Sequence, residues 1–170
     1  MAENGDSGER RGRMKEEEII NAKLASYFDM GGYVSIIKRE TGYRLILIFQ
    51  TKRNEILKWF SLQTQKNICE NQLATTCMTN LRTNVQYKVP GRQFRIHLFG
   101  EEAIKFIDRI EGYSLRHKET FKIAHVFYDN YILFFKPRTP HTPTELAIAE
   151  ECYQEMKALK QKRLNASRSA

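Results

Sequence analysis

The chain has 170 residues, of which 41% are hydrophobic and 28% charged, and its formal net charge is +8 at pH 7. This length and composition are typical of a soluble globular protein with one domain. No apolar run reaches about 18 residues and the polar N-terminus lacks the apolar core of a secretory signal, so we expect neither a membrane span nor secretion. We therefore expect an intracellular protein, in the cytoplasm, the nucleus or an organelle. The excess of basic residues favours a polyanion such as nucleic acid as its partner.

The first predicted elements are a disordered tail, a helix and a hairpin. Residues 1–14 are polar and without apolar periodicity, which predicts disorder. From residue 15, apolar residues recur at helical spacing until Gly31 and Gly32 end the helix. Two strands are predicted over 33–39 and 43–50, around the turn sequence ETG. The second strand is apolar on both faces, which indicates a central strand of a sheet.

The later elements are a helix, a second hairpin and three more helices. Residues 54–65 have a helical pattern with Asn54 as the predicted N-cap, and residues 66–80 are polar and ambiguous. Alternation over 81–88 and 93–99 predicts a hairpin that turns at Pro90 and Gly91. Helices are predicted over 100–112, 118–135 and 145–165.

This element order predicts an α+β fold of the order αββαββα, with a four-stranded antiparallel sheet covered by helices on one face. We expect a tail over 1–14, a domain over 15–136, a C-terminal helix over 137–164 after a proline-rich break, and a tail over 165–170. The three cysteines are too few and too scattered for a disulfide framework or a zinc site. The four histidines show no paired ligand spacing, so no metal site and no cofactor are predicted.

One face of the second predicted hairpin is polar and contains no acid. Arginine, asparagine and glutamine have the geometry for bidentate contacts to base edges, and a twisted antiparallel ribbon fits the major groove. We therefore predict that this face contacts nucleic acid, with a solvated surface as the alternative. The predicted contact residues are Arg82, Asn84, Gln86, Lys88, Gln93, Arg95 and His97.

The first hairpin is less polar on the corresponding face. Its polar members there are Tyr33, Ser35, Arg39, Arg44 and Gln50, and we include them in the predicted nucleic-acid surface. Isoleucines share this face, which counts against strong readout of bases. Their alternative role is to lie in a sheet that is covered on both sides.

The nine residues 24–32, LASYFDMGG, are followed by YVSI, FQTKRNEILKWF, GRQFRIHLFG and IDRIEGYSLRHKETFKIAHVF. In this order the stretches resemble the LAGLIDADG homing endonuclease family over residues 16–135. In that family two copies of the motif helix pack closely at the centre of the protein. The chain has one motif, so the resemblance implies a symmetric homodimer on a near-palindromic double-stranded DNA site. The implied interface residues are Leu24, Ala25, Ser26, Phe28 and Gly31, and the alternative is a monomer that uses this helix as core.

The resemblance also implies an altered active site. The second acid of the family motif, which holds the divalent metal, corresponds to Gly31, and glycine offers no side-chain oxygen to Mg²⁺. Asp29 matches the first acid, which is mainly structural in the family. Arg53 and Arg116 stand at accessory positions of the family site.

Three functions remain open from the sequence. The first is a DNA-binding homodimer of this family in which cleavage is lost or impaired. The second is an active homing endonuclease that uses Mg²⁺ to make double-strand breaks. The third is a protein that binds structured RNA, either as a maturase-like factor or as a structural ribonucleoprotein component.

Overall fold

A computed structural model describes residues 6–79, 86–132 and 140–168, without the side chains of 6–14, 71–79, 86–93, 164 and 167–168. The chain divides into two compact units, Met1–Leu47 with Leu98–Ala170, and Ile48–His97. We call these the larger and the smaller unit. Among the described helices, none is long and apolar enough to cross a membrane.

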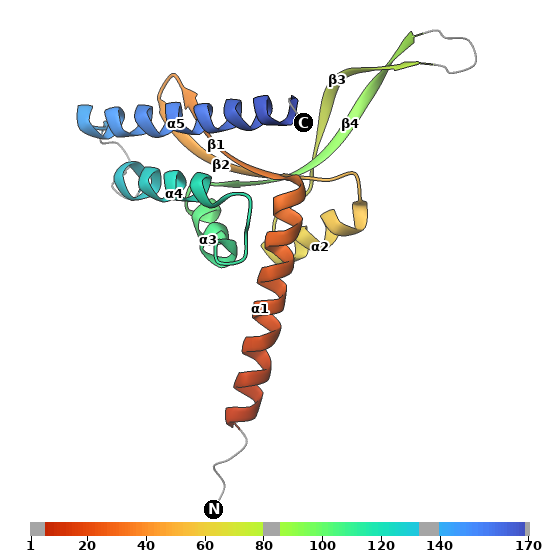
Figure 1. Cartoon of the computed structure of the whole chain (residues 1–170), viewed down its shortest axis with the longest axis vertical. Helices are drawn as coiled ribbons and strands as arrows, with labels where there is room; N and C mark the ends of the chain where they lie inside the picture. Colours follow the sequence, from red (N-terminus) through yellow and green to blue (C-terminus); the bar gives the residue numbers. More distant parts are fainter. Residues whose placement is uncertain (1–5, 80–85, 133–139, 169–170) are drawn as a thin grey trace, which may run out of the picture. The chain divides into compact units, whose positions relative to one another are not determined.

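The elements mix helices and strands in the predicted α+β manner (Figure 1). They are α1 Asp6–Gly31, β1 Gly32–Arg39, β2 Gly42–Gln50, α2 Asn54–Thr64, β3 Cys69–Thr79, β4 Gln86–Phe99, α3 Gly100–Ile110, α4 Lys118–Phe127, the π-helical turn η1 Tyr128–Ile132 and α5 Pro143–Arg168. The strands form one four-stranded antiparallel sheet in the order β1-β2-β4-β3, so the prediction of a central β2 is confirmed.

Helix α1 begins at Asp6, earlier than we predicted, so residues 6–14 are helical and not disordered. Its early turns contain charged residues that have good helix propensity, although the apolar pattern starts later. Helix α2 also differs at its start, because Arg53 occupies the N-cap position and Asn54 is the first helical residue. The backbone N–H of Arg53 donates to the Thr51 hydroxyl at 3.2 Å.

The prediction that residues 81–88 pair with residues 93–99 in a hairpin is wrong, because β4 pairs with β3. Strand β3 consists of residues that we left ambiguous, and β4 continues through Pro90 and Gly91. Leu73 pairs with Gly91 and Thr76 with Val89, so β3 carries an extra residue opposite Pro90. Because proline has no N–H to donate to the ladder, a bulge accommodates it inside the sheet without a turn.

The core of the larger unit lies on one side of β1. Val34 and Ile36 are buried, whereas the alternate residues of β1 are half-buried or exposed. Phe28 of α1 is fully buried, with ring centroids 5.6 Å from Phe106 and 6.2 Å from Phe121. The helices of this unit therefore cover one face of β1, in agreement with the predicted sheet covered on one face.

Helix α5 packs beside the β1–β2 hairpin (Figure 1). Its Glu150 carboxylate accepts from Lys38 at 2.7 Å and from the Tyr43 hydroxyl. These two hydrogen bonds lower the pKa of Glu150 to about 2. The helix starts with a capping box, in which Glu145 N–H donates to the Thr142 hydroxyl at 3.2 Å and Thr142 N–H to the Glu145 carboxylate at 2.7 Å.

The smaller unit has its own apolar contacts. Phe49, at the end of β2, stacks on Phe60 of α2 with ring centroids 4.0 Å apart. Helix α2 ends where Gln65 adopts a left-handed conformation with φ 54°. On β4, Ile96 is fully buried while Arg95 and His97 are half-buried, so the predicted alternation is confirmed at these positions.

Gly42, at the start of β2, combines a backbone constraint with a steric one. Its φ is +135°, and a Cβ there would overlap the hydroxyl of Tyr131. That hydroxyl also accepts a hydrogen bond from Tyr43 N–H at 3.0 Å. Gly42 therefore fixes how the hairpin meets η1.

We expect Gly42→Ala to lower the free energy of unfolding by about 1–3 kcal/mol, because the new side chain is strained and displaces Tyr131. Urea denaturation at neutral pH measures the change. Gly112→Ala is the matched control, because a Cβ at Gly112 meets nothing within 4 Å. Equal stability of the two variants would contradict this account.

Candidate nucleic-acid interface

Asp29, near the end of α1, has both carboxylate oxygens engaged by the loop between α3 and α4. Oδ1 accepts from the Ser114 hydroxyl at 2.6 Å, and Oδ2 accepts from Leu115 N–H at 2.8 Å and from Arg116 N–H at 3.4 Å. Ser114 is fully buried beneath this contact. A carboxylate that accepts several hydrogen bonds from backbone and hydroxyl groups acts as an anchor for that loop.

Arg116 lies at this junction. Its Nη1 donates to the backbone carbonyl of Asp29 at 3.1 Å, which satisfies a carbonyl in the last turn of α1. Its own carbonyl accepts from Nη2 of Arg163 on α5 at 2.9 Å, and the same Nη2 reaches the Thr120 hydroxyl at 3.1 Å. Arg163 therefore joins α5 to the loop that carries Arg116.

His117 is buried between this network and the aromatic core. Its ring centroid lies 5.0 Å from that of Phe28, and Nδ1 lies 3.5 Å from Nη1 of Arg163. Because a guanidinium can only donate, Nδ1 is the acceptor and the imidazole is neutral. Burial and the neighbouring Arg163 charge lower the pKa of His117 to about 4.

Gly31 is the last residue of α1, and its φ lies outside the left-handed region. Gly31 therefore has ordinary helical backbone and no side-chain oxygen. Gly32 follows, and a Cβ there would overlap the ring of Phe28. Gly32 thus lets the chain pass close over Phe28 as it enters β1.

Part of the predicted dimer interface is corrected by the structure. Leu24, Ala25 and Phe28 are fully buried in the larger unit, so their side chains contact their own chain and not a partner. Ser26 is exposed and Gly31 half-buried. Helical geometry turns Ser26 to the side opposite Phe28, about 200° away, whereas the sequence pattern alone had grouped them.

The predicted contact residues on β1 and β2 fall into two groups. Tyr33, Ser35 and Gln50 are half-buried, while Arg39 and Arg44 are exposed. The Arg44 guanidinium lies 4.0 Å from the centroid of the Phe99 ring, which holds it against β4 at the sheet surface. The isoleucines at 46 and 48 are buried, in agreement with the alternative of a covered central strand.

The predicted contact residues on the second hairpin are described only in part. Arg95 and His97 are half-buried, and burial followed by the Arg95 charge lowers the pKa of His97. Gln86, Lys88 and Gln93 belong to β4, without described side chains, and Arg82 and Asn84 lie outside the described residues. Arg53, at the start of α2, is exposed.

No pattern in the sequence marked Ser114, His117 and Arg163, the residues that surround Asp29 and Arg116. The hydrogen bond between Ser114 and Asp29 joins residues that are 85 positions apart in the sequence, and that between Arg163 and Arg116 joins residues 47 positions apart. A serine, a histidine and an arginine at such separations form no pattern with helical or strand period.

No protein-family model and no curated protein matches the chain. Two solved structures of the homing endonuclease I-CvuI are similar to it. The complex with the I-CreI target in the presence of Mg, with the DNA not cleaved, has 14% identity and a TM-score of 0.43, and the alignment covers 84% of this chain and 97% of that one. The complex with its own target in the presence of Ca has 13% identity and a TM-score of 0.42, with the same coverage.

His117 makes the stability of the protein depend on pH. Because its folded pKa lies below the ordinary value of about 6.5, its contribution is complete above that pH and is lost as the pH falls toward 4. The difference corresponds to about 3 kcal/mol. We expect His117→Phe, which cannot titrate, to lose less stability than the unmodified protein between about pH 7 and pH 4.5 in urea denaturation. Parallel pH profiles would contradict this assignment.

Proposed function

We propose that the chain is a LAGLIDADG-type nucleic-acid-binding protein that acts as a homodimer on double-stranded DNA and has lost or impaired cleavage. The end of α1 carries this proposal. The two oxygens of Asp29 already accept hydrogen bonds from the loop at 114–116, and Gly31, at the position of the second family acid, has no side chain. The motif helix therefore keeps its structural acid and lacks the acid that would hold a metal.

Cleavage needs a hard cation at the scissile phosphate. Mg²⁺ takes oxygen ligands, and it would lower the pKa of the attacking water and stabilise the leaving oxygen. Both oxygens of Asp29 accept hydrogen bonds from Ser114 and Leu115, so this carboxylate is held against the loop at 114–116. We therefore assign Asp29 a structural role and no step of a hydrolysis.

Charge and exposure support nucleic-acid binding by the face of the sheet that carries Arg39 and Arg44. The chain carries a net charge of +8. On β1 and β2 this face offers Arg39 and Arg44 to solvent beside the half-buried Tyr33 and Ser35. Two guanidinium groups at a sheet surface suit phosphate contacts, and hydroxyl groups beside them can reach sugar or base edges. Double-stranded DNA is the partner that a ribbon surface of this kind fits.

We expect the double variant Arg39→Ala, Arg44→Ala to bind duplex DNA more weakly and with a shallower dependence of log affinity on log salt. The slope should fall by about one unit for each phosphate contact removed. An electrophoretic shift titration at several salt concentrations measures both effects. The matched control is Lys105→Ala, Lys122→Ala, which removes the same charge from exposed positions on α3 and α4 and should keep the slope nearer that of the unmodified protein.

The same titrations, run with Mg²⁺, test the remaining alternatives. Bound duplex DNA should stay intact with the unmodified protein. Gly31→Asp adds a carboxylate to unstrained helical backbone and should introduce Mg²⁺-dependent nicking, while Gly31→Asn, with the same shape and no charge, should not. Double-strand cleavage by the unmodified protein would overturn the loss of activity. Tighter binding of structured RNA than of duplex DNA at equal salt would overturn DNA as the partner.

The exposed face of α1 supports the homodimer. Ile19 and Met30 are each 67% exposed, and Ser26 between them is exposed too. At about 100° per residue these three positions lie within about 40° of each other, opposite the buried Leu24 and Phe28. Two large apolar side chains around a small residue form a surface on which a second α1 can approach closely.

We expect light scattering to give about twice the chain mass of 20.0 kDa. Ser26→Arg should give a monomer, because bulk and charge then separate the two helices, and Ser26→Ala should stay a dimer. Ala25 is unsuitable for this test, because a larger side chain there would overpack the core of the protomer. A monomer of the unmodified protein at tens of micromolar would contradict the model.

A further inference from the structure

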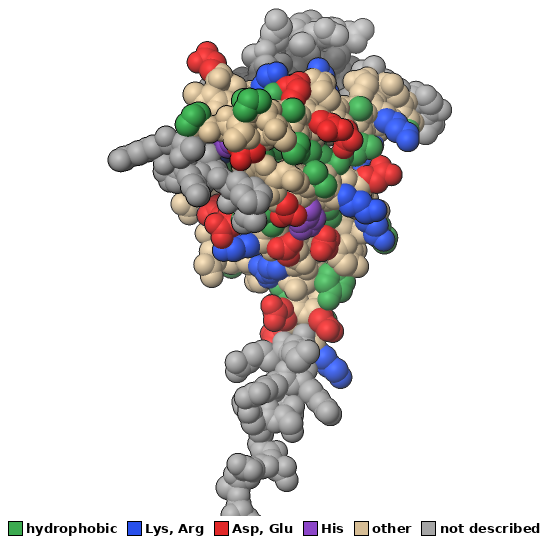
Figure 2. All heavy atoms as spheres, turned by 90° about the vertical axis from the view of Figure 1, so that its left-hand side faces the viewer, with side chains coloured by type: hydrophobic (Ala, Val, Ile, Leu, Met, Phe, Trp, Pro, Cys, Tyr) green, Lys and Arg blue, Asp and Glu red, His purple; other side chains and the backbone are tan. Residues whose placement is uncertain are grey.

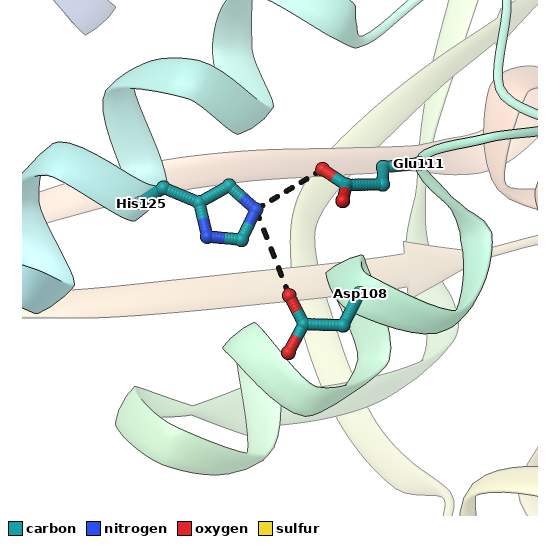
Figure 3. Close-up of side chains that lie close together, drawn as sticks. All are labelled: Asp108, Glu111 and His125. Atoms are coloured by element: carbon teal, nitrogen blue, oxygen red, sulfur yellow. Dashed lines mark hydrogen bonds and ion pairs between the residues drawn. The ribbon is translucent and has the colours of Figure 1, made fainter.

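Three side chains that could bind a metal converge between α3 and α4 (Figure 3). Asp108 lies in the last turn of α3, Glu111 directly follows that helix, and His125 lies on α4. The Nε2 atom of His125 is 3.1 Å from Oε2 of Glu111 and 3.7 Å from Oδ1 of Asp108. One imidazole nitrogen is thus directed between two carboxylates that come from a different helix.

The spacing of these atoms is close to that of a tetrahedral metal site. With metal–ligand bonds of about 2.0–2.2 Å, neighbouring ligand atoms in such a site lie about 3.4 Å apart. The two distances from His125 fall on either side of this value, and all three ligand atoms lie within 4.8 Å of one another. To reach metal-binding distances the two carboxylates need only rotate, and they are free to do so because the Asp108 and Glu111 side chains are 55% and 49% exposed.

The charge at this place also favours a cation. Two carboxylates three positions apart on a helix repel each other, and the C-terminal end of a helix carries partial negative charge of its own. A doubly charged ion offsets both effects. Figure 2 shows, on the face of the molecule that it draws, a histidine surrounded by acidic side chains at the surface. A cluster of this kind is reached from solvent, so an ion can bind without any rearrangement of the core.

We infer that Asp108, Glu111 and His125 bind a transition-metal dication, with Zn²⁺ as the best fit. An imidazole together with carboxylates suits zinc, whereas Mg²⁺ and Ca²⁺ prefer oxygen ligands alone. Three protein ligands leave a coordination position for water. The bound ion ties the end of α3 to α4 and so closes the loop of residues 111–117, whose Ser114, Leu115 and Arg116 hold Asp29.

This site is separate from the end of α1 in both residues and role. None of its three ligands belongs to the motif helix or to the proposed nucleic-acid surface. Its ion therefore stabilises the fold and is not the Mg²⁺ that a nuclease of this type would need. The test below reads metal binding and thermal stability, neither of which depends on DNA binding or on cleavage.

Isothermal titration of the tag-free protein with Zn²⁺ tests the inference. We expect one Zn²⁺ per chain, and His125→Ala, Asp108→Asn and Glu111→Gln should each weaken the affinity by on the order of tenfold or more. Saturating Zn²⁺ should raise the melting temperature of the unmodified protein by about 5 °C and that of these variants by less. Glu101→Gln, an exposed glutamate at the other end of α3, is the matched control and should behave like the unmodified protein.

Co²⁺ distinguishes this site from adventitious binding to the exposed Cys69. Ligation by nitrogen and oxygen gives weak visible bands, whereas thiolate ligation adds intense near-ultraviolet absorption. Weak bands that disappear in His125→Ala support the site. Thiolate absorption, equal Zn²⁺ affinity in the unmodified protein and His125→Ala, or no binding at all would each overturn it.

Discussion

The larger unit depends on the hydrogen bonds that the Asp29 carboxylate accepts. This carboxylate joins the last turn of α1 to the loop between α3 and α4 by hydrogen bonds of 2.6 and 2.8 Å to Ser114 and Leu115. Hydrogen bonds to a charged group contribute about 1.5–3 kcal/mol each. The preceding residue, Phe28, is fully buried against Phe106 and Phe121, so the polar tie and the aromatic core fix the same turn of α1.

These hydrogen bonds limit the ability of the end of α1 to bind a metal ion. A carboxylate oxygen that accepts hydrogen bonds from a loop is less available to a hard cation. In this chain each oxygen of Asp29 accepts at least one hydrogen bond from the loop, and Gly31, two residues later, has no side-chain oxygen. Arg116 of the loop donates to the Asp29 carbonyl, and Arg163 of α5 donates to the Arg116 carbonyl. The end of α1 is therefore held in place by both the loop and α5.

Several features could be predicted from the sequence because they depend on neighbouring residues alone. The apolar period of residues 100–110 predicted α3, and the apolar character of both faces of β2 predicted a central strand. The two glycines predicted where α1 ends, because glycine commonly follows the last turn of a helix. The net charge and the LASYFDMGG motif suggested a nucleic-acid partner and the altered acid position.

Other features were decided only by the tertiary structure, since they depend on which distant segments meet. A proline followed by glycine fits a turn and a bulged strand equally well, and the pairing of β4 with β3 selected the strand. Helix α1 has apolar residues on several sides, so packing against α3 and β1 determined that Leu24, Ala25 and Phe28 face inward while Met30 faces out. The sequence by itself determined the α+β class, the end of α1 and the net charge. The partners of Asp29 and the convergence of His125 with Asp108 and Glu111 needed the fold, because side chains far apart in the chain become neighbours only when their helices pack.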